Sequence, residues 1–72
     1  MEKINHLHYT ELRNGRKLII VSTIEFAPGR YETMVMTRNG REIEYRRTRD
    51  IAEAHRDFDE LLKKYKELKN NS

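Results

Sequence analysis

Turn signals divide the middle of the chain into runs of alternating residues, and this pattern restricts the fold more than any other feature. Residues 17–26 are rich in β-branched side chains, and their even positions are the more apolar ones. Residues 27–30 contain a Pro-Gly pair, which predicts a turn. Residues 31–38 and 41–47 follow as two further strands. The sequence therefore predicts an antiparallel β-meander.

The Asn-Gly pair at residues 39–40 predicts a two-residue turn, because both residue types tolerate a positive φ. A two-residue loop fixes the register and sets Met36 opposite Ile43 and Met34 opposite Tyr45. These four side chains would then share one apolar face, while the residues between them form a mostly polar face. We therefore expect the sheet to be covered on the methionine side only.

The N-terminal part of the chain gives weaker signals. Residues 1–6 are interpreted as a loose arm, and residues 8–12 as a short first strand with a poor pattern. A second Asn-Gly pair at residues 14–15 predicts the turn into the next strand. The meander, residues 7–47, is therefore expected to hold three or four strands.

A helix is predicted over residues 49–69, followed by a frayed end at residues 70–72. Thr48 or Asp50 can cap its start, and Asp50 with Glu53 has the spacing of a capping box. Acidic side chains in its first half and lysines in its second complement the helix dipole. Its apolar stripe consists of Ile51, Ala54, Phe58, Leu61, Leu62, Tyr65 and Leu68. The expected fold is α+β: one domain, residues 1–72, with an antiparallel meander packed on one face by a C-terminal helix.

The length and composition restrict the size of the core and the expected cellular location. A chain of 72 residues buries only about 60% of the surface that its unfolded form exposes. The chain has no cysteine, which fits a reducing compartment, and no apolar run approaches the ~18 residues that span a membrane. The start of the chain is polar and unlike a signal peptide, so we expect a cytoplasmic location. Its 15 Lys and Arg and 12 Asp and Glu are interleaved along the sequence, which is typical of a solvated surface.

Several short motifs resemble a family of small proteins from bacteriophages and prophages. The matching segments are Val-Ser-Thr-Ile at residues 21–24, Glu-Thr-Met-Val-Met at 32–36, Arg-Arg-Thr at 46–48, and His55 in the predicted helix. The resemblance extends over roughly residues 15–65. It implies a phage or prophage origin and a host-cell cytoplasmic location, but no mechanism, because the family has no established activity.

The chain departs from the family pattern in three places. Many members carry an insertion where this chain has only residues 26–30. Met36 stands where phenylalanine is usual, and Ala54 stands where a glycine often precedes the histidine. The Glu-Thr-Met-Val run is the most specific part of the resemblance.

No catalytic, metal or cofactor site is predicted. His6 and His8 are two residues apart, on the same side of an extended segment, and His55 is assigned a packing or hydrogen-bonding role in the helix stripe. Glu25 and Glu32 flank the 27–30 turn, where carboxylates are usually solvated or paired with arginines. A nucleophile would also need a base and an oxyanion donor, and no motif supplies them.

The face opposite the methionines is the candidate surface for a partner. Two functions remain open for it. The first is a non-enzymatic accessory protein that contacts a host or phage protein or a second copy of itself, and the second is a small module that reads DNA or RNA with its arginines. Glu42 and Glu44 favour the first, because they would repel phosphates. The candidate residues are Tyr31, Thr33, Val35, Arg38, Glu42, Glu44 and Arg46.

Overall fold

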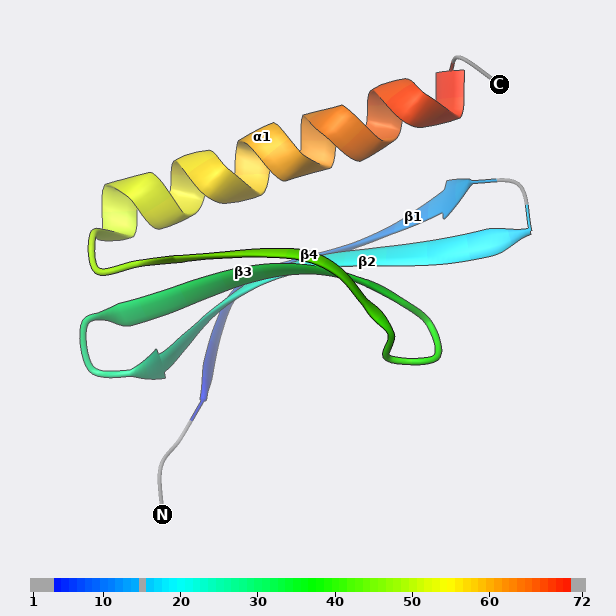
Figure 1. The fold of residues 1–72 in the computed structure, drawn as a ribbon. Helices are drawn as coiled ribbons and strands as arrows, with labels where there is room; N and C mark the ends of the chain where they lie inside the picture. The colour runs from blue at the N-terminus through cyan, green and yellow to red at the C-terminus, as the bar shows by residue number, and fades with distance from the viewer. Residues whose placement is uncertain (1–3, 15, 71–72) are drawn as a thin grey trace.

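The computed structural model describes residues 4–14 and 16–70, which form an open sheet and one helix (Figure 1). The strands pair antiparallel in the order β1-β2-β3-β4, so each strand lies beside its neighbour in sequence. The elements are β1 (Asn5–Asn14), β2 (Lys17–Ala27), β3 (Arg30–Thr37), β4 (Glu42–Thr48) and α1 (Ile51–Asn70). The predicted α+β meander with a C-terminal helix is confirmed, and the sheet of the described part has the fourth strand.

Strand β1 is longer than the sequence predicted, because it begins at Asn5; residues 1–3 of the expected arm lie outside the described residues. Its pairing with β2 shifts between His6, opposite Ile24, and His8, opposite Thr23. This bulge adds one residue to β1 and sends the two histidines to opposite faces. The prediction that they share a side is therefore wrong.

The β3–β4 loop corrects the predicted register next to the turn. Gly40 has φ 85°, as expected, but its N–H donates to the carbonyl of Thr37 at 2.9 Å. The N–H of Thr37 donates to the carbonyl of Arg41 at 2.9 Å, so the loop has three residues rather than two. This is a turn closed by a glycine in the left-handed region, the usual form of a three-residue hairpin.

The longer loop sets Met36 opposite Glu42 instead of Ile43. A second irregularity between Val35 and Met36 then cancels the shift, so that Met34 faces Tyr45 as predicted. The sequence analysis missed both irregularities, the longer loop and the shift next to Val35. Each changes the pairing by one residue, and together they cancel and leave the rest of the strand paired as predicted.

The N-terminal cap of α1 is Asp50, one of the two predicted candidates. Its carboxylate accepts a hydrogen bond from the N–H of Ala52 at 3.0 Å, and the N–H of Asp50 itself donates to the hydroxyl of Thr48 at 3.1 Å. The cap satisfies a backbone donor that has no partner inside the helix. Among the described residues, no helix is both long and apolar enough to cross a lipid bilayer.

The helix covers the opposite face of the sheet from the one predicted. Val21 and Val35 are completely buried beneath it, and Thr23 and Thr33 lie beside them with 0% and 1% of their surface exposed. The hydrophobic core consists of Ile19, Val21, Val35, Phe58, Leu61 and Tyr65, flanked by Leu12 and Leu62.

The expected packing of Phe58 and Leu61 on Met34, Met36 and Ile43 is therefore wrong. Ile43 is 43% exposed. Ile51, which was assigned to the helix stripe, is 48% exposed, and the side chain of Leu68 lies outside the described residues.

The corrected face assignment predicts unequal costs for two truncations on neighbouring strands. Val35→Ala should lower the free energy of unfolding by about 2 kcal/mol, because it opens a cavity under α1. Ile43→Ala removes more atoms but should cost no more than about 0.5 kcal/mol, because the side chain is largely solvated. Urea denaturation followed by circular dichroism measures both, and an Ile43→Ala cost equal to that of Val35→Ala would restore the original assignment.

Candidate interaction surface

Three of the predicted partner-binding residues are not on the surface. Tyr31 is 9% exposed, Thr33 is 1% exposed and Val35 is fully buried, since odd positions of β3 point toward α1. The hydroxyls of Thr33 and Thr23 are cross-strand partners and share a 2.8 Å hydrogen bond in the core. These polar groups satisfy each other, so their role is in packing the helix rather than in binding a partner.

Two more predicted residues, Glu44 and Arg46, fasten the helix to β4. The Glu44 carboxylate accepts hydrogen bonds from Lys64 Nζ and from the Tyr65 hydroxyl, both at 2.9 Å. Arg46 Nη1 lies 3.4 Å from both Asp57 and Glu60. Glu44 and Arg46 are alternate residues of the edge strand β4, so both point toward α1. Each is paired there with helix side chains of opposite charge.

The bonds around Glu44 change its ionisation. The hydrogen bond from Lys64 has the largest effect and lowers the pKa of Glu44 below its ordinary 4.5; the Tyr65 hydroxyl adds to this, and burial opposes it. Burial and the hydrogen bond to Glu44 together raise the pKa of Tyr65. The charged form of Glu44 is therefore part of the helix contact at neutral pH.

The remaining two predicted residues, Arg38 and Glu42, are exposed at the β3–β4 loop and the start of β4. Glu42 pairs with Met36 and so lies on the face of the sheet away from α1. The seven residues predicted to form one surface therefore lie in three places. Three are in the core, two contact α1, and two are exposed near the β3–β4 loop.

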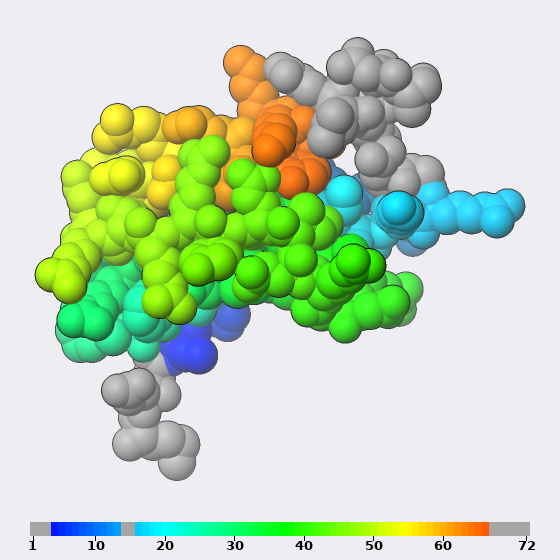
Figure 2. Space-filling model, viewed as in Figure 1, coloured from blue at the N-terminus to red at the C-terminus, as the bar shows by residue number. Residues whose placement is uncertain are grey.

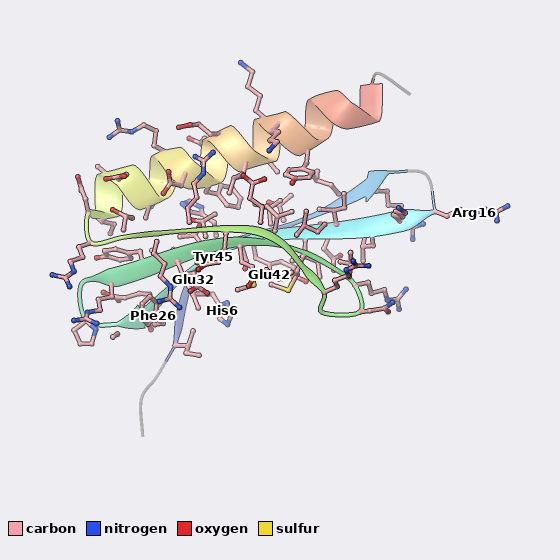
Figure 3. All side chains as sticks on the ribbon, viewed as in Figure 1. His6, Arg16, Phe26, Glu32, Glu42 and Tyr45 are labelled. Atoms are coloured by element: carbon pink, nitrogen blue, oxygen red, sulfur yellow. The ribbon has the colours of Figure 1, made fainter. Side chains whose placement is uncertain are left out.

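The face of the sheet away from α1, here called the open face, carries Met34, Met36 and Tyr45, three of the four residues that the sequence analysis had placed on the covered face. Most of them are half-buried by their neighbours, and within the described part of the chain no helix or strand packs over them. Figure 3 labels His6, Phe26, Glu32, Glu42 and Tyr45 on this side. The apolar members of the open face are Tyr9, Leu18, Ile20, Ile24, Phe26, Met34, Met36 and Tyr45.

The register arranges this face in rows that run across the strands. The central row, called the tyrosine row, consists of Tyr9, Ser22, Met34 and Tyr45, each the direct partner of the next. Tyr9 and Tyr45 are 56% and 50% exposed at its two ends, whereas Ser22 is only 8% exposed in the middle. Tyrosine is enriched at protein–protein interfaces and among the residues that contribute most to their binding energy.

Charged residues flank the tyrosine row in a defined order. On one side lies the acidic row, Glu11–Ile20–Met36–Glu42, with a carboxylate at each edge of the sheet. On the other side lies the basic row, His6–Ile24–Glu32–Arg47, with a nitrogen base at each edge. Along both edge strands, β1 and β4, the open face therefore presents a carboxylate, then a tyrosine, then a nitrogen base.

Arg47 is held in place on this face. Its Nε donates to Glu32 Oε2 at 2.8 Å, and its guanidinium lies 5.4 Å from the centre of the Phe26 ring and 5.7 Å from that of Tyr45. The hydrogen bond to Glu32 has the largest effect on Arg47 and raises its pKa. Of the two roles expected for the carboxylates beside the 27–30 turn, solvated or paired with an arginine, Glu32 has the second, while Glu25 accepts from Asn5 and from the N–H of Gly29.

A pair of histidines lies at the helix contact. His8 stacks on Phe58 with ring centres 4.5 Å apart, and its Nε2 is 2.5 Å from Nδ1 of His55. The hydrogen-bonding role predicted for His55 is confirmed, although its side chain is exposed rather than partly buried. Nowhere in the described residues do three His, Asp or Glu side chains gather as metal ligands would.

Sequence reasoning missed the open face of β2, although a signal was present. Leu18, Ile19, Ile20 and Val21 are consecutive apolar residues, and Ile24 follows close by. A continuous apolar run is typical of a strand covered on both faces, whereas alternation indicates one covered face. The run therefore pointed to a second covering layer that the predicted single helix could not supply.

No family model, no curated protein and no solved structure matches the chain. The functional interpretation therefore depends on the contacts, burial and charge order of the described residues.

The lowered pKa of Glu44 predicts a pH dependence with a definite sign. The unfolded chain holds the proton more tightly, so this contribution to stability is complete above the ordinary pKa of 4.5 and is lost as the pH falls through the lower folded value. Glu44→Gln should cost about 1 kcal/mol at neutral pH and make the acid-side decline shallower. Asp59→Asn, on the exposed side of α1, is the control; equal urea midpoints for Glu44→Gln and the parent across the pH range would contradict the assignment.

Proposed function

We propose that this chain is a non-enzymatic accessory protein of the phage or prophage type that its strand motifs resemble, and that it acts by protein–protein contact through the open face. The observation that carries the proposal is the tyrosine row, with its exposed aromatic ends on an apolar sheet face. The partner of this face is proposed to be a second copy of the chain.

The distribution of apolar residues supports a covered open face. β2 is apolar on both sides: Ile19 and Val21 pack under α1, while Ile20 and Ile24 lie half-buried on the open face. Contiguous apolar surface of this kind marks interaction sites in soluble proteins. Packing a second sheet on this face would complete a sandwich in which each sheet is covered on both sides.

The charge order supports a second copy as the occupant. With a two-fold axis along the tyrosine row, the acidic row of one copy lies over the basic row of the other. Glu11 then meets His6 and Glu42 meets Arg47, while Glu32, already paired with Arg47, faces Met36. A two-fold interface requires such self-complementarity, because the same patch serves both partners.

The alternative two-fold arrangement is disfavoured by the same charges. With the axis parallel to the strands, β1 of one copy lies over β4 of the other and the rows keep their order. Glu11 would then oppose Glu42, and the central apolar contact would be offset by carboxylate repulsion at both edges. The charge order therefore selects the arrangement with the axis along the tyrosine row.

The size of the face is adequate for a stable dimer. Strands about 4.8 Å apart and about 3.3 Å long per residue give this sheet a flat footprint of roughly 500–600 Å². A standard interface buries about 800 Å² on each partner, so a dimer through this face lies at the small end of stable interfaces. Sheets stacked face to face in sandwiches make contacts of this kind.

The polar residues that a hydrolytic site would need have other uses, which supports the non-enzymatic part of the proposal. Thr23 and Thr33 bond to each other in the core. Glu32 is held by Arg47, and Glu25 by Asn5 and the backbone of Gly29. A general acid or base needs a free position beside a substrate, and these groups are committed to neighbours within the protein.

A charge placed at the centre of the open face should separate the two copies. Light scattering after size-exclusion chromatography should give the parent about twice the 8.7 kDa mass of one chain. Met34→Arg should give a monomer with the same helical circular dichroism, because a cation cannot be buried without a partner at the two-fold axis. Ala52→Arg, which adds the same side chain on the exposed side of α1, is the matched control and should remain dimeric.

Two further outcomes would contradict the proposal, one concerning the dimer itself and one concerning the face through which it forms. A parent that is monomeric at concentrations of about 0.1 mM would overturn the dimer, since a standard interface holds at far lower concentration. A dimer that survives Met34→Arg and fails with Ala52→Arg would move the contact from the open face to the helix.

The proposed axis is tested by exchanging charges at one edge. Glu11→Lys should weaken the dimer by setting a cation against His6, and His6→Glu should weaken it by setting two carboxylates together. The double variant restores opposite charges and should recover most of the lost affinity. Dissociation constants from sedimentation equilibrium measure this coupling, and strictly additive losses would rule out the Glu11–His6 contact.

A further inference from the structure

The fold gathers cations that the sequence disperses. Arg13, Arg16 and Lys17 lie at the β1–β2 end of the sheet, and Arg38 and Arg41 lie in the β3–β4 loop at the same end. Figure 2 shows the cyan start of β2 and the green β3–β4 loop projecting together at that end of the molecule, and Figure 3 shows Arg16 reaching outward from it. We call this group of five residues the cationic end.

The two loops of the cationic end are joined by the backbone. The N–H of Arg38 donates to the carbonyl of Leu18 at 3.2 Å, which fixes the β3–β4 loop beside the start of β2. Between them lies an open hollow of about 520 Å³. The described side chains that line it are Arg13, Arg16, Lys17, Leu18, Thr37, Arg38, Asn39 and Arg41, and no carboxylate is among these described residues.

These cations are not neutralised within the described part of the protein. The ion pairs found there join Arg46 to Asp57 and Glu60, Arg47 to Glu32, and Lys64 to Glu44, and none of them includes a residue of the cationic end. Nearby carboxylates have other surroundings: Glu11 accepts a hydrogen bond from the Tyr9 hydroxyl, and Glu42 lies on the acidic row. Five like charges around one hollow repel one another, and an anionic ligand removes that repulsion.

We propose that the cationic end binds the phosphate backbone of duplex nucleic acid without regard to base sequence. The lining offers guanidinium and ammonium groups, which are the usual phosphate ligands. The hollow has no aromatic side chain on which an unpaired base could stack, so a single strand gains little there. A duplex presents the densest array of phosphates, about one charge per 1.7 Å of axis.

The site shares only Arg38 with the surface that the sequence suggested for nucleic acid. The sheet-face arginine Arg46 is bound to the helix acids, so it is occupied in the folded protein. The cationic end also lies beyond the tyrosine row and the two charged rows, so it stays accessible at the rim when the open face is covered. Binding of a nucleic-acid phosphate backbone at the cationic end is therefore independent of the proposed dimer.

The test uses the whole protein and a fluorescein-labelled duplex of arbitrary sequence, with binding followed by anisotropy at several salt concentrations. Arg16→Gln, Arg38→Gln and Arg41→Gln are combined in one variant, because all three side chains are exposed in loops and make no described ion pair. We expect an affinity loss of about 100-fold at ~0.1 M salt and a salt slope shallower by about 3.

The matched control removes the same number of charges at the opposite end, with Arg30→Gln, Arg49→Gln and Arg56→Gln. Two of these residues, Arg30 and Arg49, line a smaller hollow of about 260 Å³ beside Phe26. This control should change the affinity and the salt slope little. Equal losses in both triple variants would show diffuse attraction and overturn the proposal, as would the absence of duplex binding by the parent at low salt.

A membrane surface is the competing polyanion. Vesicles of phosphatidylglycerol are therefore included as a second probe, and circular dichroism verifies that each triple variant is folded. Binding to the vesicles without binding to the duplex would overturn the proposal in favour of a lipid surface. Met34→Arg provides a further check, because it should retain duplex binding whether or not it disrupts the dimer.

Discussion

The contact between α1 and one face of the sheet is the interaction on which the rest of the structure depends. Val21 and Val35 supply a flat β-branched surface, and Leu61 fits onto it with no exposed area. The hydrogen bond between Thr23 and Thr33 lets two polar residues join this core without an unsatisfied hydroxyl. In a chain of 72 residues, a few such side chains supply most of the apolar burial. Once the helix takes this face, the other face becomes available for a partner.

Both faces of the sheet carry apolar residues, and the face that the helix covers is the one on which the charged residues of β4 meet opposite charges of α1. Glu44 and Arg46 alternate along β4 and meet Lys64 on one side and Asp57 and Glu60 on the other. Placing α1 on the methionine face would remove these partners and bury the stripe against flexible thioethers. The same bonds occupy Arg46, whereas no residue of the cationic end takes part in an ion pair of the described residues.

The two proposed surfaces follow from this arrangement and occupy different parts of the molecule. The open face is apolar with mixed charges at its edges, which suits another protein surface. The cationic end carries one sign of charge around a hollow without aromatic residues, which suits phosphates. An interleaved sequence has thus become a molecule with separated chemical regions. The strand register causes the separation, because it aligns residues of equal type across neighbouring strands.

The sequence by itself determined most of the elements: the strand runs, the Pro-Gly turn, the Asp50 cap and the order of a meander followed by a helix. Local propensity and turn chemistry act over a few residues, so they can be interpreted without knowledge of the fold. Only the tertiary structure decided the faces. The bulge between His6 and His8 sends these two residues to opposite faces. The three-residue loop ending at Gly40 shifts the pairing only as far as Met36, because the irregularity next to Val35 restores it. The choice between two apolar faces likewise depends on contacts of α1 with β2, β3 and β4, and these join residues far apart in the chain.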